Sequence, residues 1–224
     1  MLAPGPTRAG GAPGANYGYI PPVPALRFEN VRRRFGRLAV LTGVSGAVGP
    51  GEMLLVTGPN GSGKSTLLRC LAGLLAPDAG TIEYQEEDES FDAAGRRRLA
   101  GVVTPELAFY AELTVRENLE FFSRLRRTTP EHGLAVLARL ELPLDRMAGA
   151  LSSGMRQRLR WAWALLHAPR LLLLDEPFQN FDAPGERAAR ELLAEHLAAG
   201  GLAVVANPSP LEFGHVAGHL DLGR

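Results

Sequence analysis

The chain of 224 residues has one cysteine, one lysine, few aromatic residues and no excess of either charge. The single cysteine, Cys70, excludes an intrachain disulfide and fits a reducing compartment. No apolar run approaches the roughly 18–20 residues that a membrane-spanning helix needs, so we expect no such helix. The 24 basic residues balance the 24 acidic ones, and this neutrality argues against a broad electrostatic hold on nucleic acid.

The first 24 residues differ in composition from the rest of the chain. They contain six prolines and five glycines and have no apolar core, so they resemble neither a signal peptide nor a membrane span. We predict a flexible tail over residues 1–24. The remaining residues, 25–224, are predicted to form a single domain, because a hydrophobic content of 46% is enough to bury a core.

The only lysine lies in a glycine-rich segment with the spacing G-x-x-x-x-G-K-S. The segment consists of Gly58, Pro59, Asn60, Gly61, Ser62, Gly63, Lys64, Ser65 and Thr66. This spacing is typical of a phosphate-binding loop, in which backbone N–H groups surround an anion. Lys64 would reach the outer phosphates and the Ser65 hydroxyl would bind Mg²⁺. A chance glycine-rich turn is disfavoured because a buried strand precedes the segment and a helix follows it, at residues 53–57 and 65–75.

Strands and helices alternate along the rest of the chain. This alternation predicts a doubly wound α/β sheet, with residues 101–150 as a helical insertion. Strands are expected at 25–31, 41–48, 53–57, 81–84, 171–174 and 202–206, and helices at 65–75, 115–122, 133–140, 152–166 and 183–199. The run 171–174 is apolar on both faces, which is typical of a central parallel strand.

Two carboxylates follow that strand directly. Asp175 is placed to hold Mg²⁺, through water, and Glu176 to orient or deprotonate an attacking water. An acidic pair after a strand is a weak signal by itself, because exposed loops are rich in such residues.

The motif Leu151–Arg158, reading LSSGMRQR, resembles the signature motif of ABC-type ATPases, usually written LSGGQ. An ordinary helix N-cap would explain Ser152 but not the order of the motifs. The resemblance covers nearly all of residues 26–220. It implies an α/β P-loop ATPase core with a mostly parallel sheet, an N-terminal antiparallel β portion and a helical subdomain at about 101–165. It also implies that Ser152, Ser153 and Gly154 close over the ATP of a second subunit.

Further roles are implied by the same resemblance. Phe35 falls where the family stacks an aromatic ring on adenine, although core packing is an equal alternative for one aromatic residue. Residues 112–119 fall where a transmembrane permease docks, and Asp182 falls near the dimer interface. The implied protein is a cytoplasmic ATPase held at the inner face of the cell membrane by its permease. Its compact form is most similar to exporter ATPases, including the haem exporter ATPase of cytochrome c maturation.

Two positions depart from the family pattern. Pro105 replaces the family's glutamine and has no side-chain amide for Mg²⁺ or water, although the neighbouring Glu106 is a candidate substitute. Asn207 replaces the switch histidine and cannot carry a proton. These departures leave open a second hypothesis, a regulatory or structural subunit that binds ATP and hydrolyses it weakly. A soluble family member acting on DNA or ribosomes would usually need a coiled-coil insertion or a second cassette, and neither is present.

Overall fold

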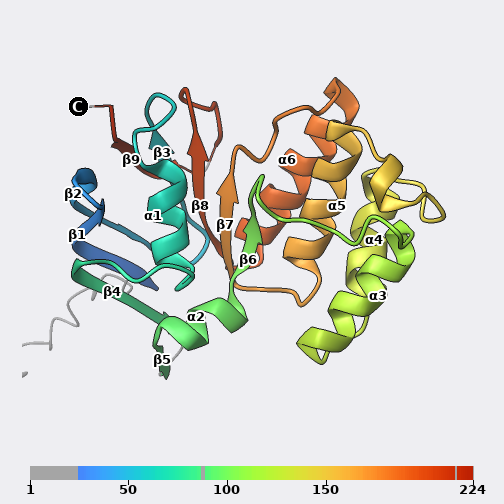
Figure 1. Ribbon diagram of the computed structural model, residues 1–224, viewed down its shortest axis with the longest axis horizontal. Coiled ribbons are helices and arrows are strands. Elements are labelled where there is room, and N and C mark those ends of the chain that lie inside the picture. The colour runs from blue at the N-terminus through green and yellow to red at the C-terminus, as the bar shows by residue number, and fades with distance from the viewer. Residues whose placement is uncertain (1–24, 87–88, 215, 224) are drawn as a thin grey trace, which may run out of the picture.

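The predicted alternation of strands and helices is present in the computed structural model, which describes residues 25–86, 89–214 and 216–223. The flexible tail predicted for residues 1–24 lies outside these residues. Two sheets and a group of helices form the described part of the chain (Figure 1). The predicted α/β class, with its parallel core and its N-terminal antiparallel portion, is confirmed.

The parallel sheet runs in the order β6-β7-β8-β3-β9. Its strands are β6 (Gly101–Val103), β7 (Leu171–Asp175), β8 (Leu202–Asn207), β3 (Met53–Thr57) and β9 (Val216–Asp221). Strands β3 and β7 are buried along their whole length, as the doubly apolar run at 171–174 predicts. The register pairs Asp175 with Ala206 and Thr57 with Asn207, so the carboxyl ends of these strands meet at one edge.

The antiparallel sheet runs in the order β2-β1-β4-β5. It consists of β1 (Leu26–Phe35), β2 (Leu38–Val48), β4 (Ala79–Glu86) and β5 (Glu89–Phe91), and the short helix α2 (Ala93–Leu99) follows it. Strands β1, β2 and β4 extend beyond the ranges predicted for them. Alternating burial of Leu26, Phe28 and Val31 directs their side chains into the core.

Helix α1 (Lys64–Leu71) packs between the two sheets, and its Leu67 belongs to the same core as Phe28 of β1 (Figure 1). It ends four residues before the predicted end at Leu75. Gly73 ends it, since its φ of +71° is left-handed and a Cβ there would lie 2.2 Å from the Ala93 carbonyl oxygen. Gly73 therefore lets the chain turn closely past α2.

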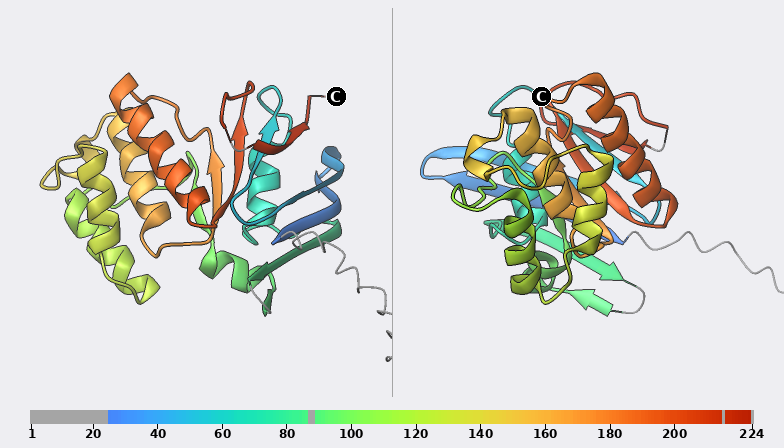
Figure 2. Two further views of the ribbon diagram at one scale, coloured as in Figure 1. Left: turned by 180° about the vertical axis from the view of Figure 1, so that it is seen from behind. Right: turned by 90° about the vertical axis from the view of Figure 1, so that its right-hand side faces the viewer.

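The other helices are α3 (Val115–Arg126), α4 (Glu131–Arg139), the 3₁₀ turn η1 (Ala148–Ala150), α5 (Ser153–Leu165) and α6 (Ala183–Ala198). Thr114 caps α3 and forms a full capping box with Glu117. Figures 1 and 2 show these helices grouped on the side of the parallel sheet away from the antiparallel one. Residues 101–103, within the range predicted as helical, instead form β6 because they pair with 172–174 of β7.

The parallel sheet separates two hydrophobic cores, because successive side chains of a strand point to opposite faces. Leu55 and Leu172 pack with α5 and α6, whereas Leu54 and Leu173 pack with α1 and the antiparallel sheet. Among the described residues, no helix combines the length and the apolar character that crossing a membrane would require.

Candidate functional site

The glycine-rich segment forms a tight loop between β3 and α1. Gly58, Gly61 and Gly63 have φ values of +142°, +84° and +103°, which residues with a Cβ rarely adopt. Gly63 directly precedes α1, and a Cβ there would lie 3.0 Å from the Val40 carbonyl oxygen. The glycines therefore let the backbone curl closely around the start of the helix.

The Lys64 side chain lies inside this loop and is only 5% exposed. Its Nζ donates to the carbonyl oxygens of Gly58 at 2.7 Å and Pro59 at 3.1 Å. Two neutral carbonyl oxygens offset only part of the desolvation cost of a buried ammonium group, and a bound anion would offset more of it. The loop thus holds one concentrated positive charge where its backbone N–H groups converge.

A second feature of the loop also favours an anion. The Ser62 hydroxyl is buried and forms no hydrogen bond to any described residue. A buried polar atom without a partner is costly, so this hydroxyl is suited to a bound ligand. A cavity of about 410 Å³ opens beside the loop and is lined by Val40, Asn60, Gly61, Gly63, Lys64, Ser65, Thr66 and Glu176. These residues fit a polyphosphate.

Ser65 at the start of α1 and Asp175 at the end of β7 line one cavity of about 220 Å³. Asp175 is only 5% exposed. Burial raises the pKa of Asp175, the carboxylates of Glu176 and Glu106 raise it further, and Ser65 and Lys64 oppose the shift. A cation at this position would stabilise the ionised carboxylate.

The described residues contain no cluster of three His, Cys, Asp or Glu side chains able to hold a metal by themselves. A divalent ion here would therefore take the Ser65 hydroxyl and Asp175 from the protein and its remaining oxygens from phosphate and water. This ligand set is typical of Mg²⁺, which keeps several waters and binds through one or two carboxylates.

Glu176 lines the same cavity as Lys64, and its backbone is strained. Its φ is +47°, a left-handed value that costs a non-glycine residue about 1 kcal/mol. Its N–H donates to the Ala206 carbonyl at 2.9 Å, and its carbonyl accepts from Gln157 Nε2 at 3.3 Å. Strand β8 and helix α5 therefore hold the backbone of Glu176 from both sides.

The two positions that depart from the family pattern have other partners. The Asn207 amide donates to the Ser209 carbonyl at 2.7 Å, and Asn207 is not among the described residues that line the cavity. The Pro105 carbonyl accepts from Arg160 at 2.8 Å. Glu106 forms an exposed ion pair with Arg69 at 3.3 Å and lines a smaller cavity of about 220 Å³ with Ser65 and Asp175.

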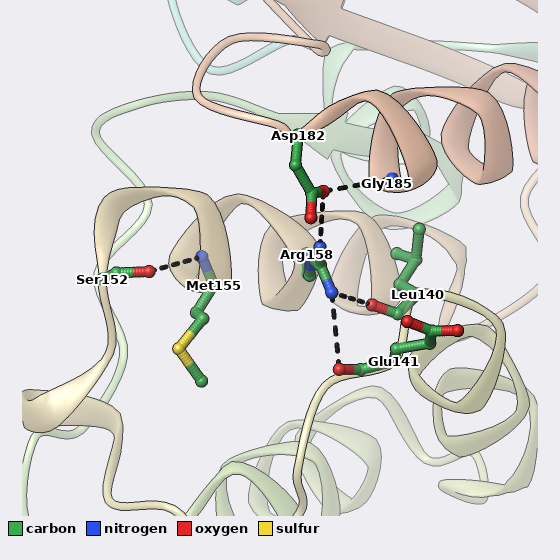
Figure 3. A network of polar contacts seen from close by, with 7 residues as sticks. All are labelled: Leu140, Glu141, Ser152, Met155, Arg158, Asp182 and Gly185. Carbon is green, nitrogen blue, oxygen red and sulfur yellow. Dashed lines mark hydrogen bonds and ion pairs between the residues drawn. The ribbon is translucent and has the colours of Figure 1, made fainter.

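The LSSG segment begins α5 some distance from the phosphate loop. Ser152 caps the helix, its Oγ accepting from the Met155 N–H at 3.2 Å, and Ser152 and Ser153 are exposed (Figure 3). A Cβ on Gly154 would lie 2.5 Å from the Asn180 carbonyl, so only glycine permits this approach to the 177–182 loop. Ser152, Ser153 and Gly154 are not among the described residues that line the 410 Å³ cavity.

Phe35 ends β1 outside both hydrophobic cores. It is 47% exposed, and the Arg33 guanidinium lies 5.0 Å from the centre of its ring. Its cross-strand partner is Leu38, two residues before Val40, which lines the cavity. The core-packing alternative for Phe35 is therefore wrong in this fold.

Sequence analysis missed Gln157, which is 4% exposed and contacts the backbone of Glu176 and Pro177. One signal was available. Gln157 lies four residues before Trp161, on the side of α5 that packs into the core, where a polar side chain needs a specific partner.

Comparison with known families supports these observations. A family model described as "ABC transporter" matches residues 41–179. A sulfate/thiosulfate import ATP-binding protein of Bradyrhizobium diazoefficiens is 39% identical over 180 residues, covering 75% of this chain and 52% of that protein. A Nod factor export ATP-binding protein of Burkholderia lata is 39% identical over 185 residues, covering 80% and 61%. The chain thus spans between half and two thirds of the length of these relatives.

Solved structures give the same fold. An ATP-binding protein of a putative ABC transporter from Pyrococcus furiosus matches with a TM-score of 0.74 at 22% identity, covering 88% of this chain and 96% of that one. An ATP-binding cassette in its ADP conformation matches with a TM-score of 0.67 at 28% identity, covering 84% and 83%.

Proposed function

The chain belongs to the ABC transporter family of ATP-binding domains, and from this premise we propose that it is an ATPase subunit that powers a separate transmembrane permease. Lys64 and the backbone of residues 58–66 bind the phosphates of ATP. Ser65 and Asp175 would hold Mg²⁺, which would supply positive charge to offset that of the phosphates. Glu176 orients and deprotonates the attacking water.

One juxtaposition carries this proposal, that of Ser65 and Asp175, which line one cavity of about 220 Å³. It joins the start of the phosphate loop's helix to the end of β7, two segments about 110 residues apart in sequence. It also places Glu176, the next residue, on the cavity that contains Lys64. Ser65 lines both cavities, so it lies between Asp175 on one side and Lys64 and Glu176 on the other. A hydroxyl, two carboxylates and an ammonium gathered in this way are the set that Mg²⁺-dependent phosphoryl transfer requires.

The exposed LSSG segment supports a dimer as the working form. Ser152, Ser153 and Gly154 begin a helix whose N-terminal dipole favours an anion, yet they do not line this chain's own cavity. We propose that two copies, or this chain and a related one, assemble head to tail so that each segment closes over the other's ATP. Phe35, exposed at the edge of β1, would stack on the adenine ring.

The direction of transport and the cellular location of the chain are separate proposals. We propose an exporter, held at the inner face of the cell membrane by a permease that docks near residues 112–119. The similar Nod factor export proteins support this direction, and the similar sulfate/thiosulfate import protein supports the opposite one. Export of haem stays a prediction. So does the division into a tail at 1–24 and one domain with a helical subdomain at about 101–165.

A second candidate function is a subunit that binds ATP and hydrolyses it weakly. Two observations favour it. The Asn207 amide is turned to the Ser209 carbonyl, and Pro105 offers only its carbonyl, which Arg160 occupies. Neither residue provides a side chain to the attacking water.

Calorimetric titration with Mg·ATP and a phosphate-release assay test the proposal. The parent chain should bind Mg·ATP, and Lys64→Ala should lose tight binding because the loop's one ammonium is removed. Lys64→Arg is the matched variant. It keeps the charge, but its wider fork should not fit inside a loop where Nζ lies 2.7 Å from a carbonyl oxygen. Unchanged ATP affinity in Lys64→Ala would refute the phosphate-loop assignment. Binding without phosphate release would favour the second candidate.

A further inference from the structure

A continuous series of hydrogen bonds joins the segment at Pro105 to the backbone of Glu176. Arg160 Nη2 donates to the Pro105 carbonyl at 2.8 Å, and Arg160 Nη1 donates to Gln157 Oε1 at 3.1 Å. Gln157 Nε2 then donates to the carbonyls of Glu176 at 3.3 Å and Pro177 at 2.9 Å. Two side chains of α5 therefore bridge loops that are about 70 residues apart in sequence.

The spacing on α5 makes this bridge possible. Residues three and four apart lie on the same side of a helix, so Arg160 and Trp161 neighbour Gln157. Trp161 Nε1 also donates to the Pro177 carbonyl, at 2.9 Å, and the Trp161 ring is completely buried. The loop after β7 is thus fixed to α5 by an indole, while the amide of Gln157 extends the connection toward Pro105.

Arg160 is energetically unfavourable at its position, because its guanidinium is partly buried. Burial and the nearby Arg156 lower its pKa, and its Nε is buried without a hydrogen-bond partner. It forms no ion pair with any described carboxylate. Its two acceptors are neutral. A partly buried charge held in this way adds little to stability, and an apolar side chain of similar length would be as stable or more so. A reason other than stability is needed for the guanidinium.

The other end of the bridge is the strained residue that lines the cavity. Glu176 has a φ of +47°, and its peptide groups are held between the Ala206 carbonyl and Gln157. Its side-chain direction depends on this backbone conformation. A contact that fixes the Glu176 carbonyl therefore also fixes the Cα–Cβ direction from which its carboxylate extends.

We propose that Arg160 and Gln157 are positioning residues that couple the 104–107 segment to the backbone of Glu176. This inference rests on the proposed function, in which Glu176 activates water. Proline at 105 offers no side-chain amide, but its carbonyl is available, and the forked guanidinium can hold that carbonyl and Gln157 at once. The segment thus acts on the site through its main chain.

Hydrogen–deuterium exchange of the full chain without nucleotide tests the coupling independently of any activity. Arg160→Met keeps the length of the side chain but removes both hydrogen bonds. Exchange of the amides of residues 176–181 should become about threefold or more faster, while the thermal midpoint stays equal or rises. If Arg160 had only a structural role, its loss would speed up exchange and lower the thermal midpoint together. Arg160→Lys, which reaches one acceptor, should give intermediate exchange and serves as the second variant if Met disturbs folding.

The matched control is Arg124→Ala, an exposed arginine on α3 outside the bridge. It should leave exchange at 176–181 unchanged. Exchange at the parent rate in Arg160→Met would overturn the proposal, and so would equal acceleration across α3, α4 and residues 176–181.

A kinetic arm separates this inference from the proposed function. Arg160→Met should lower kcat about tenfold with KM for ATP changed less than twofold, because misplacing Glu176 affects the transition state rather than binding. Arg160→Lys should recover part of the loss. An inactive parent chain would contradict the proposed function while the exchange result still decides the coupling. An active parent with unchanged kcat in Arg160→Met would overturn the coupling alone.

Discussion

Arg158 and Asp182 join the middle of α5 to the start of α6, with Arg158 Nη2 lying 2.7 Å from Asp182 Oδ1 (Figure 3). The same oxygen accepts the Gly185 N–H at 3.1 Å and so caps α6. Arg158 Nη1 donates to the Leu140 carbonyl at 2.6 Å, just after α4. One guanidinium therefore ties three helices together next to the LSSG segment.

We predict that Arg158→Ala lowers the free energy of unfolding by about 1–2 kcal/mol, because it leaves the part-buried Leu140 carbonyl without its donor. Asp182→Asn should lower it less, since asparagine caps a helix as well as aspartate does. Urea unfolding of the two variants measures the difference. A larger loss for Asp182→Asn would show that the charge on Asp182 matters more than the cap.

The phosphate loop, β3, β7 and the order of motifs were predictable from the sequence because each signal is local. Gly58 to Lys64 has a fixed spacing, and residues 171–174 are apolar on both faces. The N-terminal antiparallel portion rested on the family resemblance, and the structure confirms it.

Other features could not be predicted, because they depend on partners distant in sequence. Strand β9 is largely exposed and includes Gly218, so its sequence has no strand pattern, and it forms by pairing with β3. Similarly, nothing near Arg160 indicates that its partner is the carbonyl of Pro105. Main-chain acceptors carry no sequence signal.

We predict that Glu176→Gln retains ATP binding and loses hydrolysis. The amide keeps the shape of the side chain and the hydrogen bonds of its backbone, but it cannot accept a proton. With Mg·ATP the variant should accumulate as a dimer, because closure of two equivalent half-sites no longer ends in hydrolysis. Size-exclusion chromatography with scattering and a phosphate-release assay measure both effects. A monomer at saturating ATP, or turnover at the parent rate, would count against the role of Glu176.

His167 should make stability depend on pH. Burial and the neighbouring Arg126 lower its pKa from 6.5 to about 4, and His132 adds to the shift. Nε2 lies 3.1 Å from the Leu99 carbonyl oxygen, and Arg126 Nη1 lies 3.0 Å from Nε2 and 3.4 Å from Nδ1. A guanidinium this close to the ring favours the neutral imidazole. Between pH 6.5 and 4 the unfolded chain therefore binds a proton here that the folded chain does not. The free energy of unfolding is therefore expected to decrease as the pH is lowered from 6.5 to 4.

His167→Gln is the matched test of this dependence. Glutamine is neutral at every pH and can both donate to Leu99 and accept from Arg126. Urea unfolding between pH 7 and pH 5 should show a slope that is smaller in the variant by about 1 kcal/mol per pH unit. His196, whose pKa is also lowered by burial, contributes equally to both proteins and cancels. An identical slope in the two proteins would show that His167 is protonated in the folded chain.

The last prediction concerns Asn207, which ends β8 beside Thr57 of β3. Its amide donates to the Ser209 carbonyl rather than into the cavity, so the parent chain should hydrolyse ATP slowly. Asn207→His should raise kcat more than it changes KM, because an imidazole can contact the γ-phosphate and carry a proton in the transition state.

The matched control for that substitution is Asn207→Ala, which also releases the Ser209 carbonyl but adds no imidazole. Single-turnover hydrolysis of the parent and both variants separates the two effects. A gain in Asn207→His alone assigns the effect to the ring, whereas an equal gain in Asn207→Ala assigns it to loosening of residues 207–209. If the parent is already fast and Asn207→His slows it, this chain has its own way of placing the water. The weak-hydrolysis hypothesis would then be wrong, and the Asn207–Ser209 hydrogen bond would belong to the active arrangement.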